Sequence, residues 1–223
     1  MSCKNFCLFF VISFCVLSSN LWASDIVESS ESATEQLLAI LSDIKTVEGS
    51  FVQFTIDQRG VKVQQSAGEF KAAKPNRFVW LTEAPLEQAI YVDGAEVVVF
   101  DPDLEQATIQ ILDEQLQVTP AMLFSGKAEQ ITQSYAIEKQ KSAPEAQQFL
   151  LFPHQPDSLF EKLRIRFENG KLSYMRISDS LGQDTTVSFD SVQVNRDIPV
   201  EEFKAVLPEG TDVIRDLPLA NGS

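Results

Sequence analysis

The hydrophobic pattern of this chain changes its period once, at Gly49, and keeps the second period over most of the sequence that follows. Before this glycine, Leu37, Leu41 and Ile44 recur at helical spacing, which predicts a long amphipathic helix that ends at Gly49. After it, apolar residues alternate with polar ones, as they do in a strand that buries one face. The chain is therefore expected to be mainly β, with one long helix before the alternating region.

Turn signals divide the alternating region into short strands. Asp93-Gly94 and Asn169-Gly170 are dipeptides typical of tight hairpins, and the DPD segment at 101–103 marks a further turn. The segments between such signals give roughly nine to eleven strands. Antiparallel meanders of this kind close into barrels or bend into half-barrels.

The alternation also assigns faces to two strands. One face of FVQFTID is predicted to hold Val52, Phe54 and Ile56. One face of NRFVWLT is predicted to hold Phe78, Trp80 and Thr82. The chain has 16 phenylalanines, an excess that either an ordinary β core or an apolar cavity could use.

The segment LDEQLQVTPAMLFSGKAEQ interrupts the alternation and is predicted to form short helices. In one of them Thr119 is the N-cap, Pro120 occupies the first helical position and Gly126 follows the end. This helix has a strongly apolar surface made by Met122, Leu123 and Phe124. It could cover an open sheet, or it could be an ordinary crossover helix buried in the core.

Residues 1–23 have the order of regions of a cleavable signal peptide. One early base, Lys4, precedes an apolar run at 6–17, and the small-residue context LWA precedes a predicted cut after Ala23. The apolar run is too short to span a ~30 Å hydrocarbon core comfortably, which argues against a membrane anchor. We therefore predict that the protein is exported.

All three cysteines, Cys3, Cys7 and Cys15, lie in the predicted leader. The mature chain, residues 24–223, is then expected to have no disulfide, thiolate nucleophile, Cys-ligated metal or lipidated cysteine. It is expected to form a single domain that folds on its hydrophobic core alone.

Charge and motifs exclude several classes of function. A formal net charge of −14 repels nucleic acid and anionic headgroups. The single histidine, His154, lies between two prolines, and one histidine does not make a metal cluster. The sequence has no nucleophile elbow, Walker loop or dinucleotide fingerprint. We therefore predict a binding protein without catalytic residues, metal or cofactor, although a pair of glycosidase-type carboxylates stays open.

Several blocks of this sequence resemble the LolA family of periplasmic outer-membrane lipoprotein carrier proteins. They are GEFKAAKPNRFVW, YVDG, DPDLEQAT, TPAMLF and FKAVLPEGTDVI, in this order over nearly the whole mature chain. The resemblance implies an incomplete, strongly curved antiparallel β-barrel of about eleven strands, covered by a lid of short α-helices. It also implies a periplasmic location in a Gram-negative cell and a monomer without cofactor.

The resemblance implies a carrier and not an enzyme. Its cargo would be acylated lipoproteins, received from an inner-membrane ABC transporter and delivered to an outer-membrane lipoprotein receptor. The alternatives are a carrier or sensor of another lipid on the same fold, a structural or regulatory periplasmic protein, and an unrecognised hydrolase.

The resemblance also suggests site residues. The expected acyl-chain cavity is lined by Phe54, Phe70, Phe78, Trp80, Ile90, Val98, Phe100, Ile109, Met122, Leu123 and Phe124. A basic residue before the proline of the first block latches the lid in the family, and it is usually Arg. Here it is Lys74, which has a single ammonium in place of a planar fork of donors. Either the latch is therefore weaker than in the family, or Arg77 shares the role.

Overall fold

A computed structural model describes residues 30–216, apart from 112–119, 127, 157 and 159. The predicted leader and the predicted N-cap Thr119 therefore lie outside the described residues. In chain order the elements are α1 Ser30–Asp43, β1 Thr46–Ile56, β2 Lys62–Ala73, β3 Arg77–Ala84, β4 Gln88–Asp93, β5 Glu96–Asp101, β6 Gln106–Ile111, α2 Pro120–Ser125, α3 Ala128–Ser134, β7 Tyr135–Gln140, β8 Ala146–Pro153, β9 Lys162–Glu168, β10 Lys171–Ser178, β11 Asp184–Val194, the 3-10 turn η2 Val200–Phe203 and β12 Asp212–Asp216.

All the described strands belong to one sheet, in the order β12-β6-β5-β4-β3-β2-β1-β11-β10-β9-β8-β7. Most neighbours are antiparallel and consecutive in sequence; β1 pairs with β11 to join the two meanders. Positive φ angles at Gly94, Asn169 and Gly170 fit the two predicted hairpins. The additional strand β12 joins the edge in parallel with β6, and sequence reasoning missed it because all five of its residues are exposed and give no alternation.

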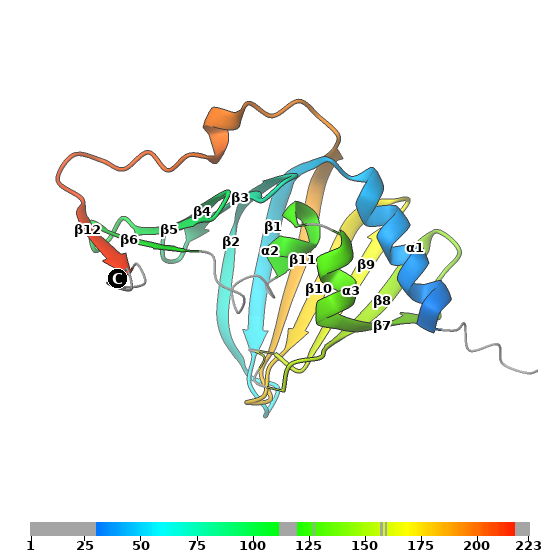
Figure 1. Cartoon of the computed structure of the whole chain (residues 1–223). Coiled ribbons are helices and arrows are strands. Elements are labelled where there is room, and N and C mark those ends of the chain that lie inside the picture. Colours follow the sequence, from blue (N-terminus) through cyan, green and yellow to red (C-terminus); the bar gives the residue numbers. More distant parts are fainter. Residues whose placement is uncertain (1–29, 112–119, 127, 157, 159, 217–223) are drawn as a thin grey trace, which may run out of the picture.

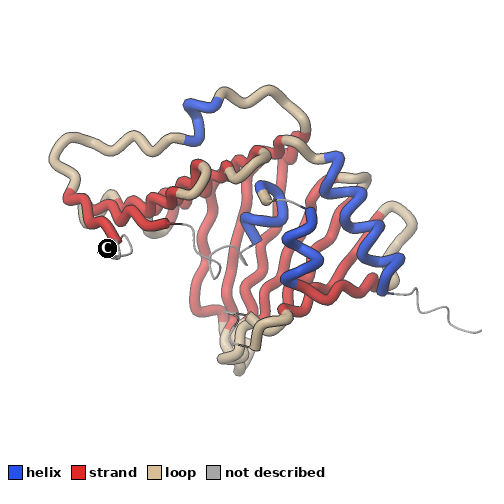
Figure 2. Tube along the Cα trace, viewed as in Figure 1, coloured by secondary structure: helices blue, strands red, loops and turns tan. Residues whose placement is uncertain are grey.

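The sheet is strongly curved and does not close, and its helices lie on the concave side (Figure 1). Helix α1 packs along the edge strand β7 and against α3, while α2 contacts β1, β2 and β3. Figure 2 shows the same arrangement, with α1, α2 and α3 on the inner side of the curved sheet and the short η2 on the opposite side. The predicted fold, an incomplete antiparallel barrel covered by short helices, is confirmed.

The predicted end of the first helix is wrong. Helix α1 ends at Asp43, and β1 begins at Thr46, so Gly49 lies inside a strand. A Cβ on this glycine would meet the Asp190 carbonyl oxygen at 2.9 Å and the Phe70 ring at 3.1 Å. The glycine is therefore required where β1 passes close to its neighbours, and it does not stop the helix.

The C-terminal segment crosses the outer face of the sheet on its way from β11 to β12 (Figure 2). Ile198 and Phe203 are buried there against Ala73 and Val79, which lie on β2 and β3. Burial of one large aromatic side chain contributes about 1.5–3 kcal/mol, so this segment is attached to the sheet by its own small core.

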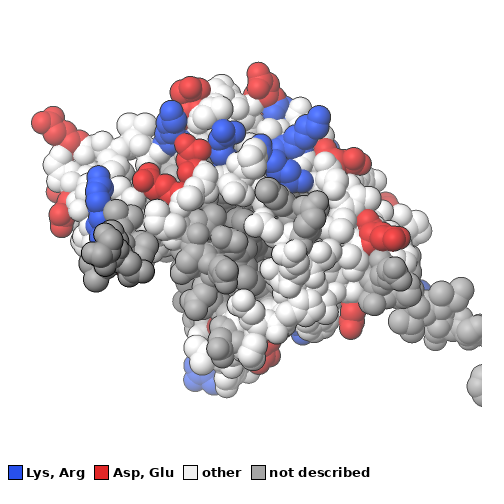
Figure 3. All heavy atoms as spheres, in the orientation of Figure 1, with Lys and Arg blue, Asp and Glu red and all other residues white. Residues whose placement is uncertain are grey.

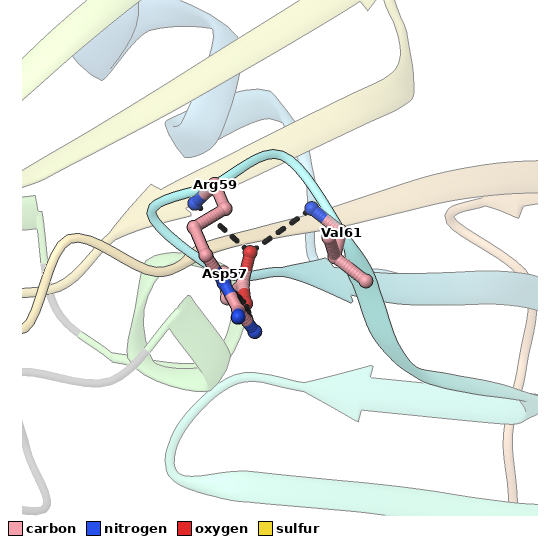
Figure 4. Close-up of polar contacts among 3 residues, drawn as sticks. All are labelled: Asp57, Arg59 and Val61. Carbon is pink, nitrogen blue, oxygen red and sulfur yellow. Dashed lines mark hydrogen bonds and ion pairs between the residues drawn. The ribbon is translucent and has the colours of Figure 1, made fainter.

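The β1–β2 hairpin tip is organised by Asp57 (Figure 4). Its carboxylate accepts hydrogen bonds from the Arg59 and Val61 backbone N–H groups at 2.9 and 3.0 Å, and from the Arg59 guanidinium at 2.7 Å. The Arg59 side chain, then the Val61 amide, hold the pKa of Asp57 below its ordinary value. The Gln58 amide donates to the Leu181 carbonyl, which ties this tip to the β10–β11 hairpin.

Charged side chains gather along the upper edge of the molecule in Figure 3. Within the described residues, no helix combines the length and apolar character that a membrane span requires.

Candidate functional site

The inner face of the central strands carries a cluster of aromatic rings. Phe51 of β1 stacks on Trp80 of β3, with centroids 3.8 Å apart. Phe78 also stacks on Trp80, with centroids 6.0 Å apart. The ring of Phe70 is tilted against Trp80 at 6.0 Å. Phe189 makes edge-to-face contacts with Phe70 at 5.0 Å and with Trp80 at 6.5 Å. Phe51, Phe70 and Phe78 are buried, so the rings form a continuous apolar surface on the concave side.

The three helices bury their apolar residues against this surface. Leu37 and Leu41 of α1, Leu123 and Phe124 of α2 and Ile131 of α3 belong to the same buried cluster as the rings. This apolar burial helps to hold the helices to the sheet, and it is not directional. An acyl chain could therefore replace the helical side chains on the rings without loss of a specific partner.

The inner face becomes polar toward the hairpin tips. Thr55 and Ser66 are buried there, beside Gln53 on the same face. The Thr55 and Thr185 hydroxyls lie 2.9 Å apart across β1 and β11. The site thus has an aromatic region under the helices and a region of hydroxyl and amide groups further along the same strands.

The β2–β3 turn contacts two of the three helices that cover the aromatic region. The Lys74 ammonium donates a hydrogen bond to the Leu41 carbonyl in the last turn of α1. The backbone N–H of Asn76 donates to the Ser125 carbonyl at the end of α2, at 2.8 Å. Partial burial lowers the pKa of Lys74 from its ordinary value. One short turn therefore joins the sheet to two separate helix ends.

The C-terminal end of α1 has a second attachment. The Asn195 side chain accepts from the Lys45 N–H at 2.7 Å and donates to the Asp43 carbonyl at 2.8 Å. The Lys74 N–H also donates to the Lys45 carbonyl, at 3.0 Å. These contacts attach the α1–β1 junction to the residues that follow β2 and β11.

The structure brings together six of the residues that the sequence assigned to a cavity. These are Phe70, Phe78, Trp80, Ile90, Leu123 and Phe124, all of which belong to the inner apolar cluster. The side chain of Met122 lies outside the described residues. The predicted pairing of Phe78 with Trp80 on one face, opposite Val79 and Leu81, is confirmed.

Four other predicted cavity residues lie on the outer face: Phe54, Val98, Phe100 and Ile109. On β1 the inner positions are those of Phe51, Gln53 and Thr55, so the assigned facing of this strand was wrong. Phe54 instead lies under the Lys62 ammonium, 5.5 Å from its ring centroid. Strand β1 has apolar residues on both faces, and the alternation alone does not tell which face is covered by helices.

The inner face of strand β5 could not be assigned from its sequence for a related reason. Its run EVVVF is apolar at every central position, and it buries Val97 and Val98 on opposite faces. Val98 pairs with Tyr91 and Ile109 on the outer side, while Val97 pairs with Val92 on the inner side. Phe51, Phe189 and Val97 are inner-face residues that sequence reasoning missed. Their faces are decided by pairing, which places Phe51 opposite Gly68 and Phe189, and Val97 opposite Val92.

Arg77 does not reach a helix among the described residues. Its guanidinium lies 3.3 Å from the Asp93 carboxylate on the neighbouring strand β4. A share of Arg77 in holding the helices stays a prediction. Within the described residues, no three His, Cys, Asp or Glu side chains group as a metal site, and His154 is exposed.

A family model and the similar sequences of known proteins carry the same description. Residues 42–206 match the family described as outer membrane lipoprotein carrier protein LolA. An outer-membrane lipoprotein carrier protein of Hahella chejuensis is 43% identical over 185 residues, covering 82% of this chain and 88% of that protein. One from Chromohalobacter salexigens is 40% identical over 182 residues, covering 82% and 86%.

Among solved structures, an uncharacterized conserved protein from Thermus thermophilus matches 84% of this chain and 99% of its own, with a TM-score of 0.54. The two sequences are 10% identical, so this likeness shows the fold alone.

Proposed function

Since the chain belongs to the LolA family of outer membrane lipoprotein carrier proteins, we propose that it carries acylated lipoproteins across the periplasm. The acyl chains would lie on the inner face of the sheet, against the rings of Phe51, Phe78 and Trp80. The observation that supports this site most directly is the stacked aromatic cluster, which faces helices and not a second sheet.

The free energy of acyl-chain hydration explains why such a carrier is needed. Each CH₂ removed from water contributes about 0.8 kcal/mol, so one sixteen-carbon chain contributes roughly 12 kcal/mol. A lipoprotein with several chains therefore leaves a membrane only when an apolar surface of similar extent replaces the lipid. The same energy would prevent release, unless the empty carrier is stabilised by contacts that loading breaks.

The helices supply those contacts. When the carrier is empty, Leu123 and Phe124 of α2 are buried on the rings. When it is loaded, acyl chains would take their place, and the Lys74 and Asn76 hydrogen bonds to the two helix ends would weaken. Re-formation of these bonds favours the empty, closed state and so assists release.

The proposed route of the lipoprotein follows from the family to which the chain belongs. Lipoproteins would come from an inner-membrane ABC transporter, which consumes the ATP, and would pass to an outer-membrane receptor. The carrier itself would need no cofactor. Residues 1–23 would direct export and be removed, leaving residues 24–223 as a single carrier domain.

Release of a lipoprotein from spheroplasts by the purified mature protein tests this function. The wild-type protein is expected to bring the lipoprotein into the soluble fraction. Phe78→Glu places a charge on the inner face and is expected to abolish release, with Phe78→Ala as a second variant of smaller effect.

The matched control is Phe54→Glu, which adds the same charge to the outer face. It is expected to release lipoprotein at the wild-type level. Circular dichroism and thermal unfolding establish that the variants are folded. Release by folded Phe78→Glu, or loss of release by folded Phe54→Glu, would overturn the assignment of the inner face.

A further inference from the structure

The outer face of β9 and β10 carries a block of four side chains on adjoining positions. Arg164 and Arg166 lie on β9, and Tyr174 and Arg176 lie on β10. In the antiparallel register Arg164 is directly opposite Arg176, and Arg166 is directly opposite Tyr174. We call these four residues the arginine patch. It lies on the side of the sheet away from the helices, because Leu163, Ile165 and Phe167 take the inner positions of β9.

The patch has fewer carboxylates than guanidiniums. Arg166 pairs with Glu168 at 2.8 Å, and Arg176 pairs with Asp184 at 2.6 Å. Arg164 has neither an ion pair nor a side-chain hydrogen bond within the part of the chain that the structure describes. The next acidic side chain along its cross-strand row, Glu138 on β7, is separated from Arg164 by Leu150 of β8. A surplus of positive charge thus persists here in a chain of net charge −14.

This arrangement is unfavourable for the isolated protein. Like charges directly opposite each other on one face of a sheet are destabilising. The Nε atoms of Arg164 and Arg166 are buried and find no hydrogen-bond partner among the described residues. Arg164 lies opposite Leu150, which is only 8% exposed, but an uncharged side chain of the same length could cover this leucine without the repulsion. A bound anion would offset the repulsion between the guanidiniums.

The geometry favours an extended peptide as the source of that anion. Arg164 and Arg166 are alternate residues of one strand, so their side chains are about 6.6 Å apart along it. Carboxylates at alternate positions of an extended segment have the same spacing, and each guanidinium can bind a carboxylate through two hydrogen bonds. The cross-strand row of Arg166 and Tyr174 continues through Ser188 to Val52, which is 46% exposed.

Arginine and tyrosine, which make up this patch, are residue types that contribute strongly to protein interfaces. We propose that the arginine patch docks an extended acidic segment of a partner protein, with alternate carboxylates on Arg164 and Arg166. This surface is separate from the acyl-chain site, because the sheet lies between them. The docking therefore holds or fails independently of the proposed carrier function.

The probe for this proposal is a short peptide in which glutamate and serine alternate. The control is a peptide of the same composition in which all the glutamates are consecutive at one end. Both are titrated into the mature protein at low ionic strength, and affinity is followed by backbone NMR shifts. The alternating peptide is expected to bind more tightly and to shift the amides of β9 and β10.

The double variant Arg164→Gln/Arg166→Gln is expected to weaken binding of the alternating peptide by about tenfold or more, since two charge-assisted contacts are lost. The control Arg59→Gln/Arg215→Gln removes the same charge from exposed positions elsewhere and is expected to change the affinity by less than about twofold.

Three results would overturn the proposal. They are equal loss of affinity in the control, shifts confined to other strands, and equal affinity for the two peptides. A fourth is binding of phosphatidylglycerol vesicles that is lost in the double variant while the peptides fail to bind, which would assign the patch to a membrane surface.

Discussion

The ring of Phe51 stacks on the indole of Trp80, although β2 lies between their strands. The residue of β2 opposite Phe51 is Gly68. With no side chain at this position, Phe51 extends over the strand and reaches Trp80. A Cβ on Gly68 would meet the Phe51 ring at 3.1 Å and the Leu81 carbonyl oxygen at 1.8 Å. The centre of the aromatic cluster therefore depends on a glycine on a third strand.

Gly68→Ala is expected to destabilise the protein by about 2–4 kcal/mol, because the clash is with backbone and requires β2 and β3 to separate. Urea unfolding followed by circular dichroism measures this. Gly94→Ala is a suitable comparison, since it adds a methyl group to a turn with open space and is strained only through its positive φ. A loss below about 1 kcal/mol in Gly68→Ala would contradict the close approach.

Phe51→Ala is expected to lower the free energy of unfolding by about 3–5 kcal/mol, because it empties a buried position at the centre of the cluster. The other tryptophan of the chain, Trp22, lies in the predicted leader, so fluorescence of the mature protein reports Trp80. We expect its emission to move to longer wavelength in the variant. Unchanged emission and stability would show that Phe51 does not shield Trp80.

Lys74→Leu is expected to retain lipoprotein uptake but to reduce transfer to receptor-containing membranes. The variant leaves the Leu41 carbonyl of α1 without its donor, which destabilises the closed, empty carrier relative to the loaded one. A hydrogen bond from a charged donor contributes ~1.5–3 kcal/mol, so the transfer equilibrium should shift by about tenfold or more.

The measurement for Lys74 is the fraction of lipoprotein that stays with the carrier after incubation with those membranes. Lys74→Arg keeps a charged donor and is the matched control, expected to transfer at least as well as wild type. Equal retention by Lys74→Leu and the wild type would remove Lys74 from the release step.

Acid is expected to weaken the fold through Asp184. Its hydrogen bond from Arg176 is the main cause of a pKa below the ordinary value of 3.8. Because the folded pKa is the lower one, the contribution of this carboxylate to stability is present above pH 3.8 and is lost as the pH falls through the folded pKa. Asp184→Asn should therefore show a shallower loss of unfolding free energy below about pH 4 than the wild type.

The pH series needs a charge-matched comparison. Asp190→Asn removes a carboxylate from an exposed position on the same strand. If Asp184→Asn and Asp190→Asn alter the acid limb to the same extent, the Arg176–Asp184 pair is not the cause.

Arg164→Gln is expected to leave the free energy of unfolding unchanged or to raise it by ~0.2–1 kcal/mol, because it relieves the repulsion with Arg176. Arg176→Gln is the contrasting variant, expected to lower stability because it breaks the pair with Asp184. Thermal and urea unfolding compare the two. Similar losses in both would mean that Arg164 has a structural role and would argue against a docking surface.

Local sequence was sufficient for the type of most elements. The alternation and the Asp93-Gly94 and Asn169-Gly170 turns predicted an antiparallel meander, because side-chain period and turn chemistry are properties of a few adjacent residues. Pro120 and the apolar residues after it predicted α2 for the same reason. The resemblance of several blocks then indicated an open, helix-covered sheet, which the structure confirms.

The faces of the strands depended on tertiary structure. In β1 and β5 apolar residues occur on both faces, so Phe51 and Phe54, or Val97 and Val98, are equivalent by local pattern. The inner face is decided by where the helices and the C-terminal segment pack, through pairing between residues far apart in sequence. Gly49 likewise resembles a helix stop until β2 and β11 are placed beside it. The sequence by itself determined which elements form; only long-range packing decided which side of the sheet the helices cover.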